Sequence, residues 1–102
     1  GVFIAECKFW EGKKILEEAV SQVLDYLTWR QSHGVIILFS RNQGFTSVLE
    51  AVKSAISTLP MYVKGAEQTN TARFKAVHHL KEDEKRLIEI HYLVYNLCST
   101  KG

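Results

Sequence analysis

The sequence contains few cysteines, and this scarcity limits the classes to which the protein can belong. Its two cysteines, Cys7 and Cys98, stand near opposite ends of the 102 residues. Zinc sites and disulfide-rich scaffolds need closely spaced or numerous cysteines, so neither class is predicted here. We expect free thiols and a cytoplasmic location, with a single disulfide as the open alternative.

Long apolar runs and a strong excess of one charge are also absent. No run approaches the roughly 20 residues of a membrane-spanning helix, and no signal peptide is recognisable. No membrane partner is therefore predicted. The formal net charge is only +2, so nucleic-acid binding would need a local basic patch rather than bulk charge.

Acidic residues are missing from the first five positions, and Asp25 and Asp83 are the only aspartates. The chain opens on Gly1 and enters an apolar strand without a leading loop. Natural domains seldom begin in this way. We therefore expect residues 1–102 to form a single small domain that lacks part of its N-terminal side.

Hydrophobic periodicity predicts an α/β fold with elements in the order β-α-β-α-β-β. Alternation predicts a strand over residues 2–9, and helical spacing follows from Lys13 to about Trp29. The continuous apolar run over 34–42 is typical of a strand that is covered on both faces and pairs in parallel. We expect this strand to lie beside residues 2–9 in a mixed sheet with helices packed on it.

The second half of the chain is predicted to contain one helix and one hairpin. Ser47 and Glu50 have the spacing of a capping box, and Pro60 should end the helix that follows. Residues 61–71 are polar and contain glycine, so we predict a loop. Two strand-like segments then flank a charged connector and predict an antiparallel hairpin; they are residues 72–80 and 87–97.

Glu6 and Lys8 place two charges on one face of the first predicted strand. A simple ion pair on a half-exposed sheet is one interpretation. The other is phosphodiester hydrolysis, because a carboxylate can hold a divalent cation beside a phosphate. Glu6 and the main-chain carbonyl of Cys7 suit Mg²⁺, and Lys8 would orient the attacking water or stabilise the transition state. The Cys7 side chain should pack in the core.

Gln22 and Tyr26 form a Q-x-x-x-Y pattern on the first predicted helix. Residues four apart share a flank of a helix, so an amide and a phenol would project together. They would reach either a phosphate or the residues of the metal site. The alternative is that Tyr26 packs at the boundary of the core while Gln22 is solvated.

The segments IAECKFW, EEAVSQVLDYLTWR and GVIILFSRN together resemble the PD-(D/E)xK nuclease superfamily, in the branch that carries a Q-x-x-x-Y helix. The resemblance covers residues 2–42. It implies a restriction-endonuclease-like core and Mg²⁺-dependent cleavage of DNA. It also implies catalytic roles for Glu6, Lys8, Gln22 and Tyr26, with Glu6 as the metal-binding acid.

The family's aspartate on a preceding strand has no counterpart in this chain, because none of residues 1–5 is acidic. One carboxylate rarely holds Mg²⁺ tightly. We therefore expect a nuclease-like core without its first strands, with weak metal binding and little or no cleavage. The alternative is a non-catalytic nuclease-like module for dimerisation or nucleic-acid binding.

Partners are predicted from edges and basic residues. A missing neighbour would leave residues 2–9 as a bare hydrophobic edge, and bare edges recruit partners, so we expect a homodimer through this strand. Arg30 and Arg41 are candidate phosphate contacts, because Arg41 follows a parallel strand at the sheet edge where ligands usually bind. His78 and His91 are interpreted as sheet-surface residues that meet across the hairpin at most, since no third zinc ligand is evident.

Overall fold

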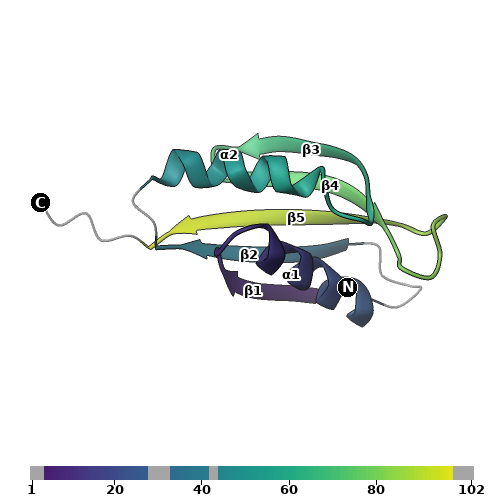
Figure 1. The fold of residues 1–102 in the computed structure, drawn as a ribbon. Coiled ribbons are helices and arrows are strands. Elements are labelled where there is room, and N and C mark those ends of the chain that lie inside the picture. Colours follow the sequence, from purple (N-terminus) through teal and green to yellow (C-terminus); the bar gives the residue numbers. More distant parts are fainter. Residues whose placement is uncertain (1–3, 28–32, 42–43, 98–102) are drawn as a thin grey trace, which may run out of the picture.

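The computed structural model describes residues 4–27, 33–41 and 44–97, which form five strands and two helices (Figure 1). No helix in these ranges is long and apolar enough to cross a membrane. In chain order the elements are β1 (Ile4–Phe9), α1 (Lys13–Tyr26), β2 (His33–Ser40), α2 (Phe45–Ile56), β3 (Tyr62–Asn70), β4 (Arg73–His79) and β5 (Leu87–Asn96).

The strands form one mixed sheet in the order β1-β2-β5-β4-β3. β1 pairs in parallel with β2, as predicted, with Glu6 opposite Ile36 and Lys8 opposite Leu38. β2 is also parallel to β5, and the predicted β4–β5 hairpin is confirmed as antiparallel. β1 and β3 are therefore the two edge strands of the described sheet.

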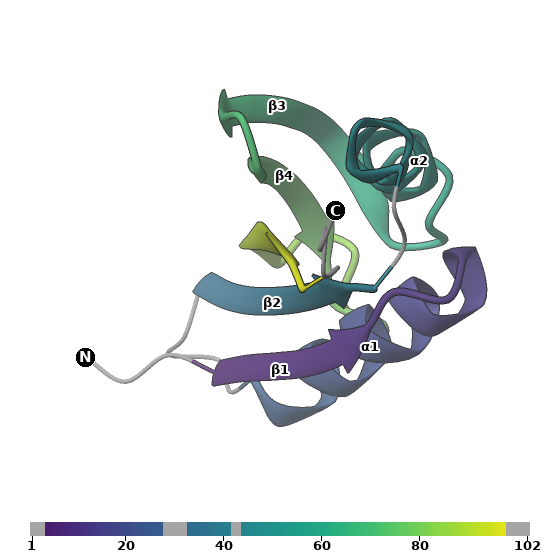
Figure 2. The same ribbon diagram turned by 90° about the vertical axis from the view of Figure 1, so that its left-hand side faces the viewer.

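Both helices cover the same face of the sheet, which Figure 2 shows in an end-on view. The prediction that β2 is covered on both faces is therefore wrong. Only its alternate residues are buried, including Ile36 and Leu38, whereas Val35, Ile37 and Phe39 stay half-exposed on the other face. An apolar run is compatible with both arrangements, because it shows how apolar each face is and not what covers it.

The contact between α1 and the sheet is close at Gly34. A Cβ atom at this position would lie 2.6 Å from Val23 Cγ1 of α1, which is closer than packed carbon atoms approach one another. The absence of a side chain at Gly34 thus lets α1 settle over β1 and β2. This packing brings the helix predicted to carry functional residues beside the strand that carries Glu6 and Lys8.

Two predictions for the second half of the chain are wrong. α2 begins at Phe45 after Gly44, without a side-chain capping bond, so Ser47 does not form a capping box. The predicted loop over residues 61–71 is mostly strand β3. This strand is polar and mainly exposed, and it bends where Gly65 and Ala66 take φ values of 106° and 73°, so its sequence shows no clean alternation.

Candidate active site on the first strand

Glu6 and Lys8 lie on the helix-covered face of β1, where alternate residues are half-buried. Ile4 on the same face packs against the hydrophobic core. The Glu6 and Lys8 side chains retain only 23% and 25% of their exposure, and Glu6 Oε1 lies 4.0 Å from Lys8 Nζ. The strand thus holds an acid and an amine side by side at the rim of the core, as their spacing predicted.

The separation between these two groups is longer than a hydrogen bond. Charged hydrogen bonds of this type have N···O distances of about 2.7–2.9 Å, and the ion pair between Lys81 and Asp25 reaches 3.0 Å. The Glu6 carboxylate is therefore near enough to Lys8 to interact electrostatically but keeps its oxygens available. Such a carboxylate can accept a cation as a further partner.

Gln22 and Tyr26 do not meet Glu6 and Lys8 directly. Within the described ranges, no hydrogen bond or ion pair joins either helix residue to the strand pair. Tyr26 is the last residue of α1 and is 61% exposed. Gln22 is half-buried, and its Oε1 atom is buried without a hydrogen-bond partner. Gln22 is thus the member of the pair that retains an unused polar group at the boundary of the core.

Cys7 lies on the opposite, helix-free face, so the prediction that its side chain packs in the core is wrong. Its side chain is exposed and its thiol is free. The error follows from the sheet having a single helix layer, because every second residue of β1 then faces outward. The predicted metal ligand at this position is the main-chain carbonyl, which is independent of the side chain's direction.

Of the two candidate phosphate contacts, the structure describes Arg41. Arg41 follows β2 and places its guanidinium over the ring of Phe9, 3.7 Å from the ring centre. This is a cation–π contact that links the ends of β1 and β2 on the helix-free face. Arg30 lies outside the described residues. Asp25, one of the two aspartates of the chain, is exposed and pairs with Lys81, so it does not replace the missing acid of the site.

Sequence reasoning missed a polar cluster on the helix-free face, centred on Glu89 of β5. Its Oε2 atom lies 3.2 Å from His33 Nε2 and 3.0 Å from His91 Nε2, and its Oε1 atom lies 3.8 Å from Lys75 Nζ. Partial burial raises the pKa of Glu89, but the hydrogen bond with His91 and the nearby charges outweigh it and lower that pKa overall. The sequence did indicate part of this cluster, because Glu89 and His91 are two residues apart on one strand and so share a face.

A groove of about 550 Å³ lies beside this cluster. It combines cationic and aromatic or aliphatic side chains, and it crosses four strands of the sheet. The lining residues are His33, Val35, Thr69, Arg73, Phe74, Lys75, His91, Tyr92 and Leu93.

His78 lies on the helix-covered face and is fully buried, so it does not meet His91 across the hairpin. It faces Tyr62 on β3, and its Nε2 atom hydrogen-bonds to the Tyr92 hydroxyl. Its Nδ1 atom is buried and makes no hydrogen bond within the usual limits. Burial lowers the pKa of His78 and raises the pKa of Tyr92. Both side chains are therefore neutral elements of the core.

No group of three or more His, Cys, Asp or Glu side chains in residues 4–27, 33–41 and 44–97 is arranged to hold a metal ion. Comparisons with protein-family models, curated proteins and solved structures found no match for this chain. Its function must therefore be inferred from the geometry of its own residues.

Proposed function

We propose that this chain carries part of a metal-dependent nuclease centre of the PD-(D/E)xK type, located on β1. Glu6 is the carboxylate that binds Mg²⁺, and Lys8 orients the attacking water and stabilises the charge that develops on the phosphate. The observation that carries the proposal is the placement of the two half-buried groups on one face, 4.0 Å apart and not locked in a hydrogen bond.

The neighbouring groups support this assignment. α1 packs on β1, and we propose that its Gln22 and Tyr26, which make no direct contact with Glu6 or Lys8, would act by contacting the substrate. The main-chain carbonyl of Cys7 is a second oxygen of the type that Mg²⁺ prefers. Because Mg²⁺ favours several oxygen ligands, the centre needs a further carboxylate, and we propose that it comes from a strand that pairs with the free edge of β1.

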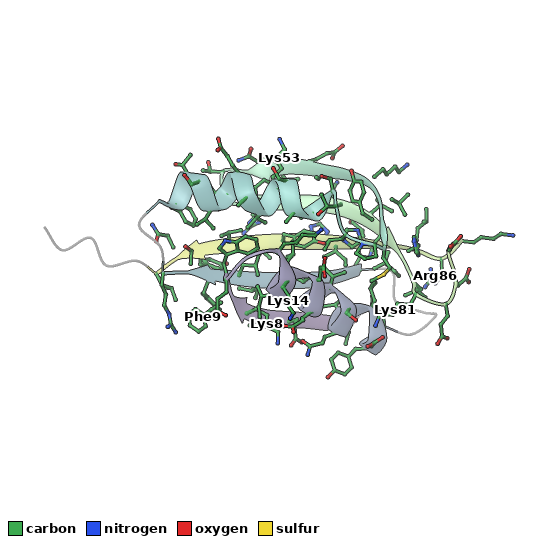
Figure 3. All side chains as sticks on the ribbon, viewed as in Figure 1. Lys8, Phe9, Lys14, Lys53, Lys81 and Arg86 are labelled. Carbon is green, nitrogen blue, oxygen red and sulfur yellow. The ribbon has the colours of Figure 1, made fainter. Side chains whose placement is uncertain are left out.

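Plasmid DNA incubated with Mg²⁺ or Mn²⁺ tests this proposal. Because the centre needs the further carboxylate, we expect nicking only when the strand that supplies it is paired with β1. That nicking should require the metal and fall at least about a hundredfold in Glu6→Ala and in Lys8→Ala, since each removes an electrostatic group from the reacting centre. Lys53→Ala is the matched control, because Lys53 lies on α2 at the opposite side of the molecule from Lys8 (Figure 3). Cleavage that survives both active-site substitutions would remove these residues from the mechanism.

Nucleic-acid binding without cleavage is the second candidate function, and the groove on the helix-free face favours it. Arg73 and Lys75 border this groove together with His33 and His91, and such side chains contact phosphates. Binding of a labelled duplex should weaken as salt rises, and Arg73→Ala should reduce the affinity. The exposed Cys7 thiol is compatible with the cytoplasmic location that we propose for either function.

A further inference from the structure

The main-chain groups of β1 are divided between β2 and the free edge of the sheet. Trp10 donates its N–H to the carbonyl of Phe39 at 2.8 Å, so the main-chain groups of Trp10 point toward β2. Main-chain groups alternate in direction along a strand, and β1 pairs with β2 without a register shift. Ala5, Cys7 and Phe9 therefore direct their N–H and C=O groups toward the free edge.

We propose that the strand that occupies this edge is β1 of a second copy of the chain, running antiparallel, with Cys7 opposite the partner's Cys7. A two-fold axis at this point also places Ala5 opposite the partner's Phe9. The residues that face the edge then meet as hydrogen-bonded pairs, in which each exchanges both main-chain bonds with the other. The resulting sheet would be continuous across both copies.

The charges of β1 select this register over its neighbours. With Cys7 at the centre, Glu6 stands opposite the partner's Lys8, at a narrow position where facing Cα atoms are about 4.5 Å apart. Opposite charges at such positions stabilise a strand pair, and like charges destabilise it. The nearest alternative registers that keep the helix-covered faces on the same side are shifted by two residues. One of them sets Glu6 opposite the partner's Glu6, and the other sets Lys8 opposite the partner's Lys8.

The helix-free face supports the same pairing through apolar contacts. Phe9 is 40% exposed and would cover the partner's Ala5 on this face. A shallow pocket of about 290 Å³ adjoins it, and is lined by Cys7, Lys8, Phe9, Phe39 and Leu97. The apolar surface at the end of β1 is thus continuous with the free edge, where a second copy would bury it.

This pairing also supplies the further carboxylate that the active centre needs, a step that rests on the proposed nuclease function. The partner's Glu6 is a diagonal neighbour of Glu6 on the helix-covered face, and diagonal neighbours about 7–8 Å apart lie within reach of long side chains. Two carboxylates and two lysines would then form two facing pairs around the dimer axis. The pairing itself does not depend on this step.

Cross-linking tests the register. In a Cys98→Ser background, oxidation with copper phenanthroline should join two chains through Cys7, because facing Cα atoms of a hydrogen-bonded pair are about 5.5 Å apart and suit a disulfide. The matched control is the double variant Ala5→Cys, Cys7→Ser, which moves the thiol to another exposed position on the same face of β1. We expect it to cross-link at least about tenfold more slowly, since Ala5 then faces the partner's Phe9.

Sedimentation equilibrium of charge variants tests the complementarity. Glu6→Lys or Lys8→Glu alone should raise the dimer dissociation constant at least about tenfold, and the double exchange should restore it, because opposite charges face each other again. Cys7→Pro should abolish the dimer, since it removes an N–H from the free edge and leaves the bonds to β2 in place. Circular dichroism confirms that each variant is folded, and Cys7→Ser is the control for Cys7→Pro.

Three results would overturn the pairing: a monomer at about 0.1 mM, equal cross-linking from position 5, or a double exchange that fails to restore the dimer. These assays contain no Mg²⁺, Mn²⁺ or DNA, so their failure leaves the nuclease proposal standing. Conversely, a dimer with the predicted register that shows no metal-dependent cleavage would support the pairing and count against the nuclease centre.

Discussion

The two edge strands of the sheet differ in how they protect themselves from further pairing. β3 breaks register with β4 at three places, and its residues are mostly polar and exposed. β1 is short and regular, and it carries exposed Cys7 and Phe9 beside the free edge. Sheet edges recruit other strands unless bulges, charges or proline obstruct them. β3 therefore carries features that obstruct further pairing, whereas β1 lacks them and is the edge at which we propose a partner strand.

The largest expected effect comes from changing the bulge that distorts β3. Gly65 has a φ of 106°, and a Cβ atom there would lie 3.1 Å from Ala76 Cα on β4. Gly65→Ala should therefore lower the free energy of unfolding by about 2–3 kcal/mol, through backbone strain and a main-chain contact that cannot move aside. Urea unfolding measures this change.

The matched substitution on the other edge is Ala5→Val, which adds a larger side chain to an exposed site of a regular strand. We expect it to change stability by less than about 0.5 kcal/mol. Equal decreases in the free energy of unfolding of the two variants would mean that β3 is not the more distorted of the two edge strands.

Acid should weaken the side of the sheet that holds β3, because buried His78 faces Tyr62 there. In the folded protein, burial lowers the pKa of His78 below its ordinary value of 6.5. As the pH falls below 6.5, the unfolded chain therefore takes up a proton at this residue before the folded protein does. The free energy of unfolding is therefore unaffected by the titration of this residue above pH 6.5. Below that pH it declines by up to about 1.4 kcal/mol per pH unit.

Urea unfolding between pH 7.5 and about 5 measures this slope. His78→Gln removes the titrating group and retains a hydrogen-bonding side chain toward Tyr92, so it should flatten the slope. His79→Gln is the control, because His79 is only half-buried and bonds to the Leu80 carbonyl. An unchanged slope in His78→Gln would assign the acid sensitivity to another group.

A smaller effect is expected at the open edge, where Arg41 lies over the ring of Phe9. Arg41→Ala should cost about 0.5–1 kcal/mol of stability, the range of a cation–π contact at an exposed site. Lys53→Ala, on the exposed surface of α2, should cost less. Thermal unfolding compares the two variants, and equal midpoints would show that the contact over Phe9 contributes nothing measurable.

The sequence allowed most of the fold to be predicted where burial imposes a period on the residues. The parallel pair of β1 and β2, helix α1 and the β4–β5 hairpin follow from apolar spacing. β3 was not predictable in this way, because an exposed, bulged edge strand has no buried face to impose alternation. The coverage of the sheet by helices on one face only was also not predictable, since the apolar run of β2 does not reveal whether a second layer covers its other face.

The candidate site was predictable only as far as local geometry extends. The i, i+2 spacing of Glu6 and Lys8 determines that they share a face, whatever the rest of the fold. The position of Gln22 and Tyr26 relative to them depends on how α1 crosses β1, which spacing does not encode. The cluster around Glu89 depends on the register between β2 and β5, so His33 could not be associated with it from the sequence.

Binding of Mn²⁺ tests the central claim most directly, because it reports on Glu6 without requiring catalysis. Electron paramagnetic resonance of free Mn²⁺ should show saturable binding that weakens at least about tenfold in Glu6→Gln, which keeps the size of the side chain and removes its charge. Glu50→Gln on the exposed surface of α2 should bind as the unchanged protein does. Equal binding by both variants would contradict the assignment of Glu6 as a metal ligand.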